Sequence, residues 1–197
     1  MAVIPSPFGM LLESSIASYN FTEMASNLGY VAFYPYTSSG SFLTTNSTLH
    51  SSGAYTNSPA TKVFSVKFNK QTLIGGPAKI NLLHGDYDNV GDISGLYSIS
   101  IFKNSILLAS GALIATYPTT PGAGALKTTY VCADIEIPET IIGAGDELKL
   151  RIAFESNGSG RLGHDPANTS WTDLGLTPAA GPDATRSTFL VPFRINL

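Results

Sequence analysis

Apolar and polar residues alternate along most of the chain after residue 61, which is the pattern of β-strands with one buried face. Segment 147–154 shows it best, because every second side chain is apolar and the residues between them are mostly charged. The side chains expected in the core there are Leu148, Leu150, Ile152 and Phe154. Segments with a similar pattern are 62–68, 78–83, 96–102, 105–115, 128–137 and 187–197.

Glycine- and proline-rich stretches separate these segments, and little of the sequence has helical periodicity. The pattern therefore predicts an all-β fold, an antiparallel β-sandwich of jelly-roll type with about seven to eight strands. Lys103-Asn104 is a candidate two-residue turn between neighbouring strands. Pro192 predicts that the last strand lies at a sheet edge or contains a bulge.

Residues 1–61 differ from the rest of the chain in composition. They contain no Lys or Arg, and thirteen of the twenty-five residues from 37 to 61 are Ser or Thr. Eight aromatic residues nevertheless lie between positions 8 and 42. Two interpretations remain open: an ordinary first strand, near residues 30–34, followed by a long loop, or an arm that orders against neighbouring subunits. A short helix near residues 10–18 is the only helical candidate.

This composition divides the chain into an N-terminal arm or interface region, residues 1–61, and a jelly-roll sandwich, residues 62–197. Charged residues make up only 13% of the chain, about half the usual share. The net charge of −3 gives no basic footprint for nucleic acid, and no apolar run is long enough to span a membrane. Cys132 excludes an internal disulfide because it has no partner, and we expect it to be a small buried residue.

Part of the predicted sandwich resembles the galactose-binding-like jelly roll, a non-catalytic domain found in the X-Pro peptidase and cocaine esterase family. The similar residues are Leu73-x-Gly75, Ala78–Leu82, Leu96–Ile101, Ile137-Pro138 and Ala144-Gly-Asp-Glu-Leu-Lys-Leu-Arg-Ile152. In that pattern a Gly-Asp turn precedes a strand of alternating leucine and basic residues. The resemblance implies the fold and carries over no catalytic residue, because the family's nucleophile belongs to another domain.

The C-terminal part resembles the C-terminus of β-sandwich virion proteins of tailed bacteriophages. The residues that carry this resemblance are Leu162-Gly-His-Asp-Pro-Ala-Asn168 and Phe189-Leu-Val-Pro-Phe-Arg-Ile-Asn196. Pro5-Ser-Pro-Phe8, without the basic residues of a secretion signal, suits such a protein. The resemblance implies a capsid decoration (cement) protein, a minor capsid protein or a head fibre.

A loop rich in aspartate follows His84. Asp86, Asp88 and Asp92 could supply the oxygen ligands that calcium prefers, but their spacing departs from the EF-hand pattern. Asp, Asn and Gly are also the residues that ordinary turns favour, so we expect a plain loop and predict no metal site.

Other combinations of polar residues have weaker patterns. Ser159, His164 and Asp165 lack the strand–turn–helix setting of a serine nucleophile, and His50 and His84 have no ligand-like spacing. Asp134 and Glu136 share one strand face, as a glycosidase pair would. If their strand pairs with 147–154 as a hairpin, they lie opposite Arg151 and Lys149 in a ladder of ion pairs. If the two strands belong to different sheets, that ladder does not form.

The sequence thus predicts no catalytic, cofactor-binding or metal-binding residues and no enzyme activity. We expect a structural protein of a phage particle, made in the host cytoplasm, that stabilises the particle through contacts with its own copies and other capsid subunits. The alternative is a carbohydrate-binding module or receptor-binding adhesin. Its sugar-stacking rings would come from Tyr36, Tyr87, Tyr117 or Trp171.

Overall fold

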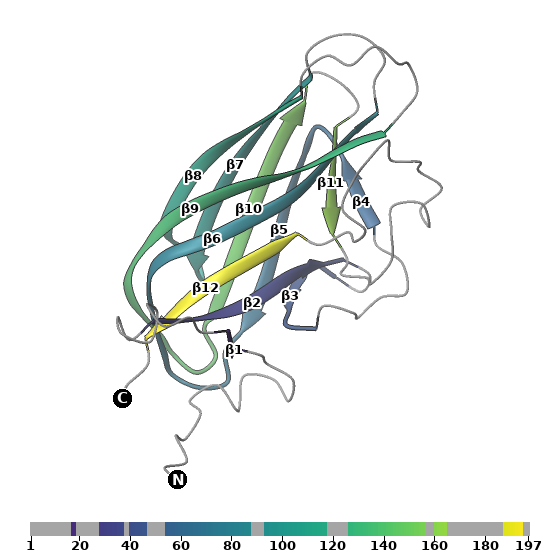
Figure 1. Ribbon diagram of the computed structural model, residues 1–197. Helices are drawn as coiled ribbons and strands as arrows, with labels where there is room; N and C mark the ends of the chain where they lie inside the picture. Colours follow the sequence, from purple (N-terminus) through teal and green to yellow (C-terminus); the bar gives the residue numbers. More distant parts are fainter. Residues whose placement is uncertain are drawn as a thin grey trace.

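The computed structural model (Figure 1) describes residues 17–18, 28–37, 40–46, 54–87, 93–117, 126–156, 160–164 and 187–194. Every regular element in this part is a β-strand, and the twelve strands form a two-layered sandwich. The predicted all-β sandwich is therefore confirmed. No helix in the described residues is long and apolar enough to cross a lipid bilayer.

Hydrogen bonds connect the strands in the order β4-β11-β6-β12-β2-β3-β5-β10-β7-β8, with β1 added to β2 and β9 to β6. The first layer contains β1 (Ala17–Ser18), β2 (Leu28–Tyr36), β4 (Ala54–Asn57), β6 (Thr72–Tyr87), β9 (Leu126–Ile142), β11 (Gly160–His164) and β12 (Thr188–Arg194). The second contains β3 (Phe42–Thr44), β5 (Ala60–Lys67), β7 (Ile93–Lys103), β8 (Ile106–Tyr117) and β10 (Glu147–Ser156). All pairs are antiparallel except β3 with β5.

Strand β2 connects the two layers. Its residues 28–33 pair with β12 in the first layer, and residues 34–36 pair with β3 in the second. Val31 and Phe33 are 0% and 1% exposed. The predicted boundary at residue 61 therefore needs correction, because residues 28–61 supply β2, β3, β4 and the start of β5 to the sandwich. Residues 1–16 and 19–27 lie outside the described part.

The core lies between the two layers and is lined by the inward faces predicted from the alternation. In β10, Leu148, Leu150 and Ile152 are 0% exposed and Phe154 is 1% exposed, as expected. In β5, Phe64 is buried, and Phe68, just after the strand, is buried too. The first layer contributes Val31, Phe33, Ile74, Ile80, Leu82, Ile135, Ile137, Leu162, Phe189, Val191 and Phe193.

The predicted ladder between Asp134, Glu136 and the basic residues of β10 is wrong. Strand β9 pairs with β6, whereas β10 lies between β5 and β7 in the other layer. The turn at 143–146 carries the chain from one layer to the other, so that the apolar faces of both strands are buried in the same core. Asp134 instead lies opposite Lys79, and Glu136 lies opposite Pro77.

Cys132 is exposed, so the expectation of a buried residue was wrong. Its neighbours Val131 and Ala133 pack inward, and the two-residue period of the strand therefore turns Cys132 outward. The apolar surroundings in the sequence come from residues on the other face of the same strand.

The structure has a hairpin turn and a strand bulge close to where the sequence predicted a turn and an irregularity. The β7–β8 turn consists of Asn104 and Ser105, one residue later than predicted, and Asn104 has a positive φ of 54°. Such a φ suits asparagine in a tight hairpin turn. Strand β12 lies inside its sheet, between β2 and β6, and its register shifts between Leu190 and Phe193. Pro192 therefore marks a bulge rather than an edge.

At residues 17–18 the predicted helix is replaced by β1, and residues 10–16 lie outside the described part.

Candidate functional site

The outward side of the β7–β8 hairpin is a continuous surface without charged side chains. The strand register sets Leu96 opposite Ile114 and Ser98 opposite Ala112, so these four side chains point the same way. We call this surface the β7–β8 face; its residues are Leu96, Ser98, Ser100, Phe102, Leu107, Ser110, Ala112 and Ile114. The chain has no charged residue between Lys103 and Lys127, so one strand of this face is neutral throughout.

Several large apolar side chains on this hairpin are in contact with solvent. Ile114 is 66% exposed, and its cross-strand neighbour Leu96 is 47% exposed. Leu107 is 53% exposed and Ile106 at the turn is 63% exposed. Single exposed leucines are common on proteins, but exposed apolar residues gathered on one hairpin are typical of an interaction surface.

A hollow of about 400 Å³ borders the β7–β8 face. Thr61, Ala153 and Ser98 lie side by side on β5, β10 and β7, and their short side chains leave the sheet surface low at this point. Phe154 also lines the hollow, but it is only 1% exposed and its ring stacks on Tyr97 with centroids 5.5 Å apart. Among the described residues, the lining of the hollow thus offers hydroxyl groups, apolar groups and the exposed Glu155, and no exposed aromatic ring.

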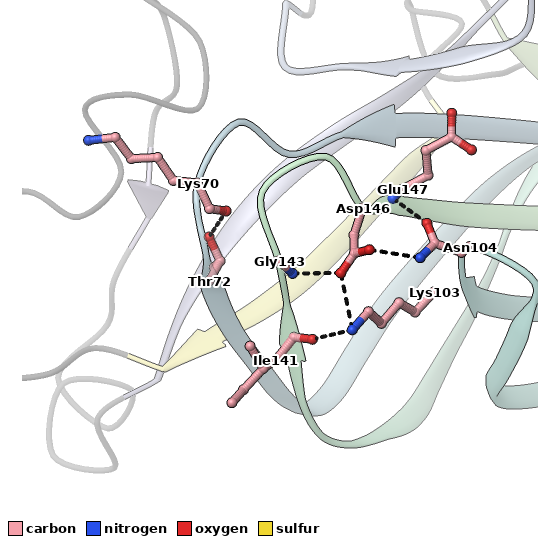
Figure 2. Close-up of polar contacts among 8 residues, drawn as sticks. All are labelled: Lys70, Thr72, Lys103, Asn104, Ile141, Gly143, Asp146 and Glu147. Atoms are coloured by element: carbon pink, nitrogen blue, oxygen red, sulfur yellow. Dashed lines mark hydrogen bonds and ion pairs between the residues drawn. The ribbon is translucent and has the colours of Figure 1, made fainter.

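A polar network at the opposite end of the hairpin fixes its turn to the rest of the sandwich (Figure 2). The Asp146 carboxylate accepts hydrogen bonds from Asn104 Nδ2 at 2.8 Å and from the Gly143 amide at 2.7 Å. Lys103 Nζ lies 3.1 Å from the same carboxylate and donates to the Ile141 carbonyl at 2.8 Å. These donors lower the pKa of Asp146 to about 2, with Asn104 the largest contribution, so the carboxylate stays charged at neutral pH.

The backbone conformation and hydrogen bonds of this network explain why Gly145 and Asp146 form the turn. Gly145 has a φ of 89°, a conformation that residues with a side chain rarely adopt. The Gly145 amide donates to the Phe68 carbonyl at 2.7 Å, and the Phe68 amide donates to the Asp146 carbonyl at 2.9 Å. The turn therefore holds β10 in position beside the end of β5.

Two buried histidines lie near the other end of the sandwich. The His84 ring forms a hydrogen bond through Nδ1 with the Tyr97 hydroxyl, and the close approach of Gly95 and Gly160 makes room for it. His164 Nε2 lies 2.8 Å from the Thr56 hydroxyl. Their exposed fractions are 0% and 3%. Both rings thus join strands inside the sandwich. Ser159 and Asp165, the other members of the weak serine-type pattern, lie outside the described residues.

Burial of His84 should make the stability of the protein pH-dependent. Desolvation lowers its pKa from 6.5 to about 4, so the folded protein holds it neutral while the unfolded chain binds a proton below pH 6.5. The free energy of unfolding should therefore fall by about 2 kcal/mol between pH 7 and pH 5. Urea denaturation at both pH values measures this change.

The matched variant is His84→Gln, which keeps a polar side chain beside Tyr97 and removes the titration. It should lose most of the pH dependence over that range, although its stability at pH 7 will be lower. Equal slopes for the two proteins would show that His84 titrates normally in the folded state.

The remaining predicted polar residues have varied positions. Asp86 lies in β6 and Asp88 and Asp92 lie outside the described residues; within the described part no three His, Cys, Asp or Glu side chains could jointly hold a metal ion. Tyr36 is only 9% exposed and packs on Phe42, so it is not the exposed ring that sugar stacking requires. The side chains of Tyr87 and Tyr117, as well as His50 and Trp171, are not among those described.

Comparison with known proteins supports the fold alone. No protein-family model matches the chain, and no curated protein is similar to it. Among solved structures, a CocE/NonD family hydrolase from Staphylococcus aureus has a TM-score of 0.52 at 12% identity over 85% of this chain. An aminopeptidase from a marine sediment Thaumarchaeota archaeon has a TM-score of 0.56 at 6% identity over 86% of this chain. In both cases the match spans 37% of the other protein.

These similarities show a fold in common and no more. The jelly-roll pattern of the sequence around Gly75, Leu96 and Asp146 occupies β6, β7 and the turn before β10. The sequence analysis missed the β7–β8 face, although the charge-free stretch after Lys103 could have indicated it. What was missing was the register that brings Leu96 and Ile114 together.

Proposed function

We propose that this chain is a non-enzymatic structural protein of a virus particle, a decoration, cement or minor capsid protein of a tailed bacteriophage. On this proposal it works by adhesion, through contacts with neighbouring subunits. The observation that carries the proposal is the β7–β8 face, with exposed Leu96, Leu107 and Ile114 and no charged side chain.

The energetics of such a surface favour lasting contact. Burying apolar area contributes about 25 cal/mol per Å², and charges that lose water without finding a partner oppose association. The β7–β8 face has apolar area to bury and no charged side chain of its own, and the exposed Arg151 and Glu155 lie beside it on β10. A stable interface needs about 800 Å² from each partner, so the face would form its centre rather than its whole extent.

The resemblance to phage virion proteins supports the choice of particle. Its two segments supply residues 162–164 of β11 and residues 189–194 of β12, and Leu162, Phe189 and Val191 from them are fully buried. Residues 165–168 and 195–196 of the two segments lie outside the described part. The low charge of the chain as a whole points in the same direction.

A glycan-binding role has less support from the geometry. Sugar-binding sites commonly stack aromatic rings against the sugar, but among the described residues the one aromatic ring lining the hollow beside the β7–β8 face is the buried Phe154. A hydrolase role drawn from the structural neighbours has no supporting group of residues in the described part. Both roles are outcomes of the test below.

Purified particles from the native source should contain this chain, and the purified protein should bind shells stripped of it. Leu96→Lys places a charge in the β7–β8 face and should weaken shell binding at least tenfold in co-sedimentation. Val63→Lys is the matched control, because Val63 is 43% exposed on β5 of the same sheet but outside the face. Absence from particles, glycan-array binding or ester hydrolysis would contradict the proposal.

A further inference from the structure

Two strands form the free edges of the sandwich on one side of the molecule. Among the described residues, β8 pairs only with β7, and β9 pairs only with β6. Their layers face each other there, and β8 and β9 run close together (Figure 1). An edge strand presents a row of amide and carbonyl groups that can pair with another strand, so proteins usually protect such edges.

The β9 edge is protected against pairing. Asp134, Glu136 and Glu139 are exposed on this strand, and Pro138 lacks an amide donor. The register with β6 also shifts beside Pro138, between Ile74 and Gly76. Exposed like charges, a proline and a bulge are the features that keep a second strand from adding to an edge.

The β8 edge lacks the charges and the proline. Its twelve residues include no charged residue and no proline. Its register with β7 shifts once, between Leu107 and Ala109 near the turn, and is regular from Ala109 to Tyr117. Ile106, Leu107 and Ile114 are exposed on it, and the inward-facing Ala109 and Leu113 are only partly buried. An apolar edge strand of this kind favours the addition of another strand.

Strand β9 approaches β8 from inside the sandwich. A Cβ atom on Gly111 would lie 3.0 Å from Ile135 Cδ1, so the missing side chain of Gly111 lets Ile135 pack against the inner surface of β8. This packing covers the face of β8 that points to the core. It does not pair with the edge, where the main-chain groups of β8 face away from β7.

We propose that β8 pairs antiparallel with β8 of a second copy of this chain, about a twofold axis. The two β5-β10-β7-β8 layers then form one continuous sheet. A second copy suits this edge because an uncharged strand that pairs with itself brings no like charges together, whereas the charged β9 edge would resist it. Twofold pairing of one surface with itself is also the commonest way in which identical subunits associate.

Strand β8 is long enough to pair with a second copy of itself. Twelve residues extend over roughly 40 Å, enough for a row of main-chain hydrogen bonds between the two copies. The dimer also joins the two β7–β8 faces into one surface of double the size. In the proposed function, this dimer would be the unit that adheres to the particle. The biological role of the dimer rests on that function, whereas the pairing of the two strands does not.

Sedimentation velocity over a range of protein concentrations tests the pairing. The variant Ser110→Lys/Ala112→Lys puts charges on the edge strand, where the two copies would meet. The matched control is Ser98→Lys/Ser100→Lys, because these residues lie directly opposite on β7 and point to the same face, one strand away from the edge. We expect a dimer for the wild type and the control. The edge charges should weaken association and raise the dimer Kd at least tenfold.

Hydrogen exchange identifies the strand that pairs. Raising the protein concentration through the dimer transition should slow exchange of β8 amides and leave β9 amides unchanged. A wild type that stays monomeric at 100 µM or above, an equal loss of dimer in both double variants, or concentration-dependent protection of other strands would overturn the proposal. A monomer that still binds shells would overturn the β8 pairing alone, whereas a β8 dimer that binds no shell would contradict only the proposed function.

Discussion

Deleting residues 1–61 should unfold the sandwich rather than remove an arm from it. The deletion takes away β2, which pairs with both β12 and β3, and β3 itself. The buried Val31 and Phe33 of β2 and Leu43 of β3 are lost with them. Burial of each such side chain stabilises a protein by about 1.5–3 kcal/mol, so their loss is comparable to the whole stability of about 5–15 kcal/mol. Circular dichroism with thermal melting measures the result.

A shorter deletion is the control for this experiment. Removing residues 1–27 takes β1 from the described structure and leaves β2 and its pairing with β12 intact. This variant should keep a cooperative transition. If the deletion of residues 1–61 also melts cooperatively, with a strand-rich spectrum, then β2 is dispensable and an independent sandwich begins near residue 62.

Phe154→Ala should lower the free energy of unfolding by about 3–5 kcal/mol. The Phe154 ring is 1% exposed and stacks on Tyr97, whose hydroxyl is hydrogen-bonded to His84. Alanine therefore leaves a cavity beside the Tyr97 ring, which the hydrogen bond to His84 holds in place, and the surrounding strands can close it only in part. Urea denaturation followed by fluorescence or circular dichroism measures the change.

The neighbouring Glu155→Ala is the control, because Glu155 is exposed on the same strand and should change stability by less than about 0.5 kcal/mol. A cost below about 1 kcal/mol for Phe154→Ala would mean that the inner face of β10 is assigned incorrectly. Equal costs for both variants would mean the same.

The alternation of residues predicted the inner faces of individual strands well. Leu148, Leu150 and Ile152 are buried as expected, and Phe64 faces the core from β5. This works because side chains alternate strictly along a strand, and burying one face requires apolar residues at every second position. The same rule places Cys132 outward, and the error there came from weighing its apolar neighbours instead of its position in the period.

The pairing of strands was beyond such a rule. Strands β9 and β10 are adjacent in the sequence, yet the turn at Asp146 sends them to opposite layers. The low charge of residues 1–61 left open a first strand followed by a loop or an arm, and the structure places β2 between β12 and β3. Charge and composition indicate how exposed to solvent a segment is on average. They do not indicate which strands pack against it.

The candidate surface shows the same division. The sequence by itself determined the two-residue period of each strand, the all-β class and the charge-free stretch after Lys103, because these depend on neighbouring residues alone. Only the tertiary structure decided that Leu96 lies beside Ile114, that β8 is an edge and that β9 carries charges along its own edge. Those properties arise when residues distant in the chain are brought into register, and many registers can bury the same alternating faces.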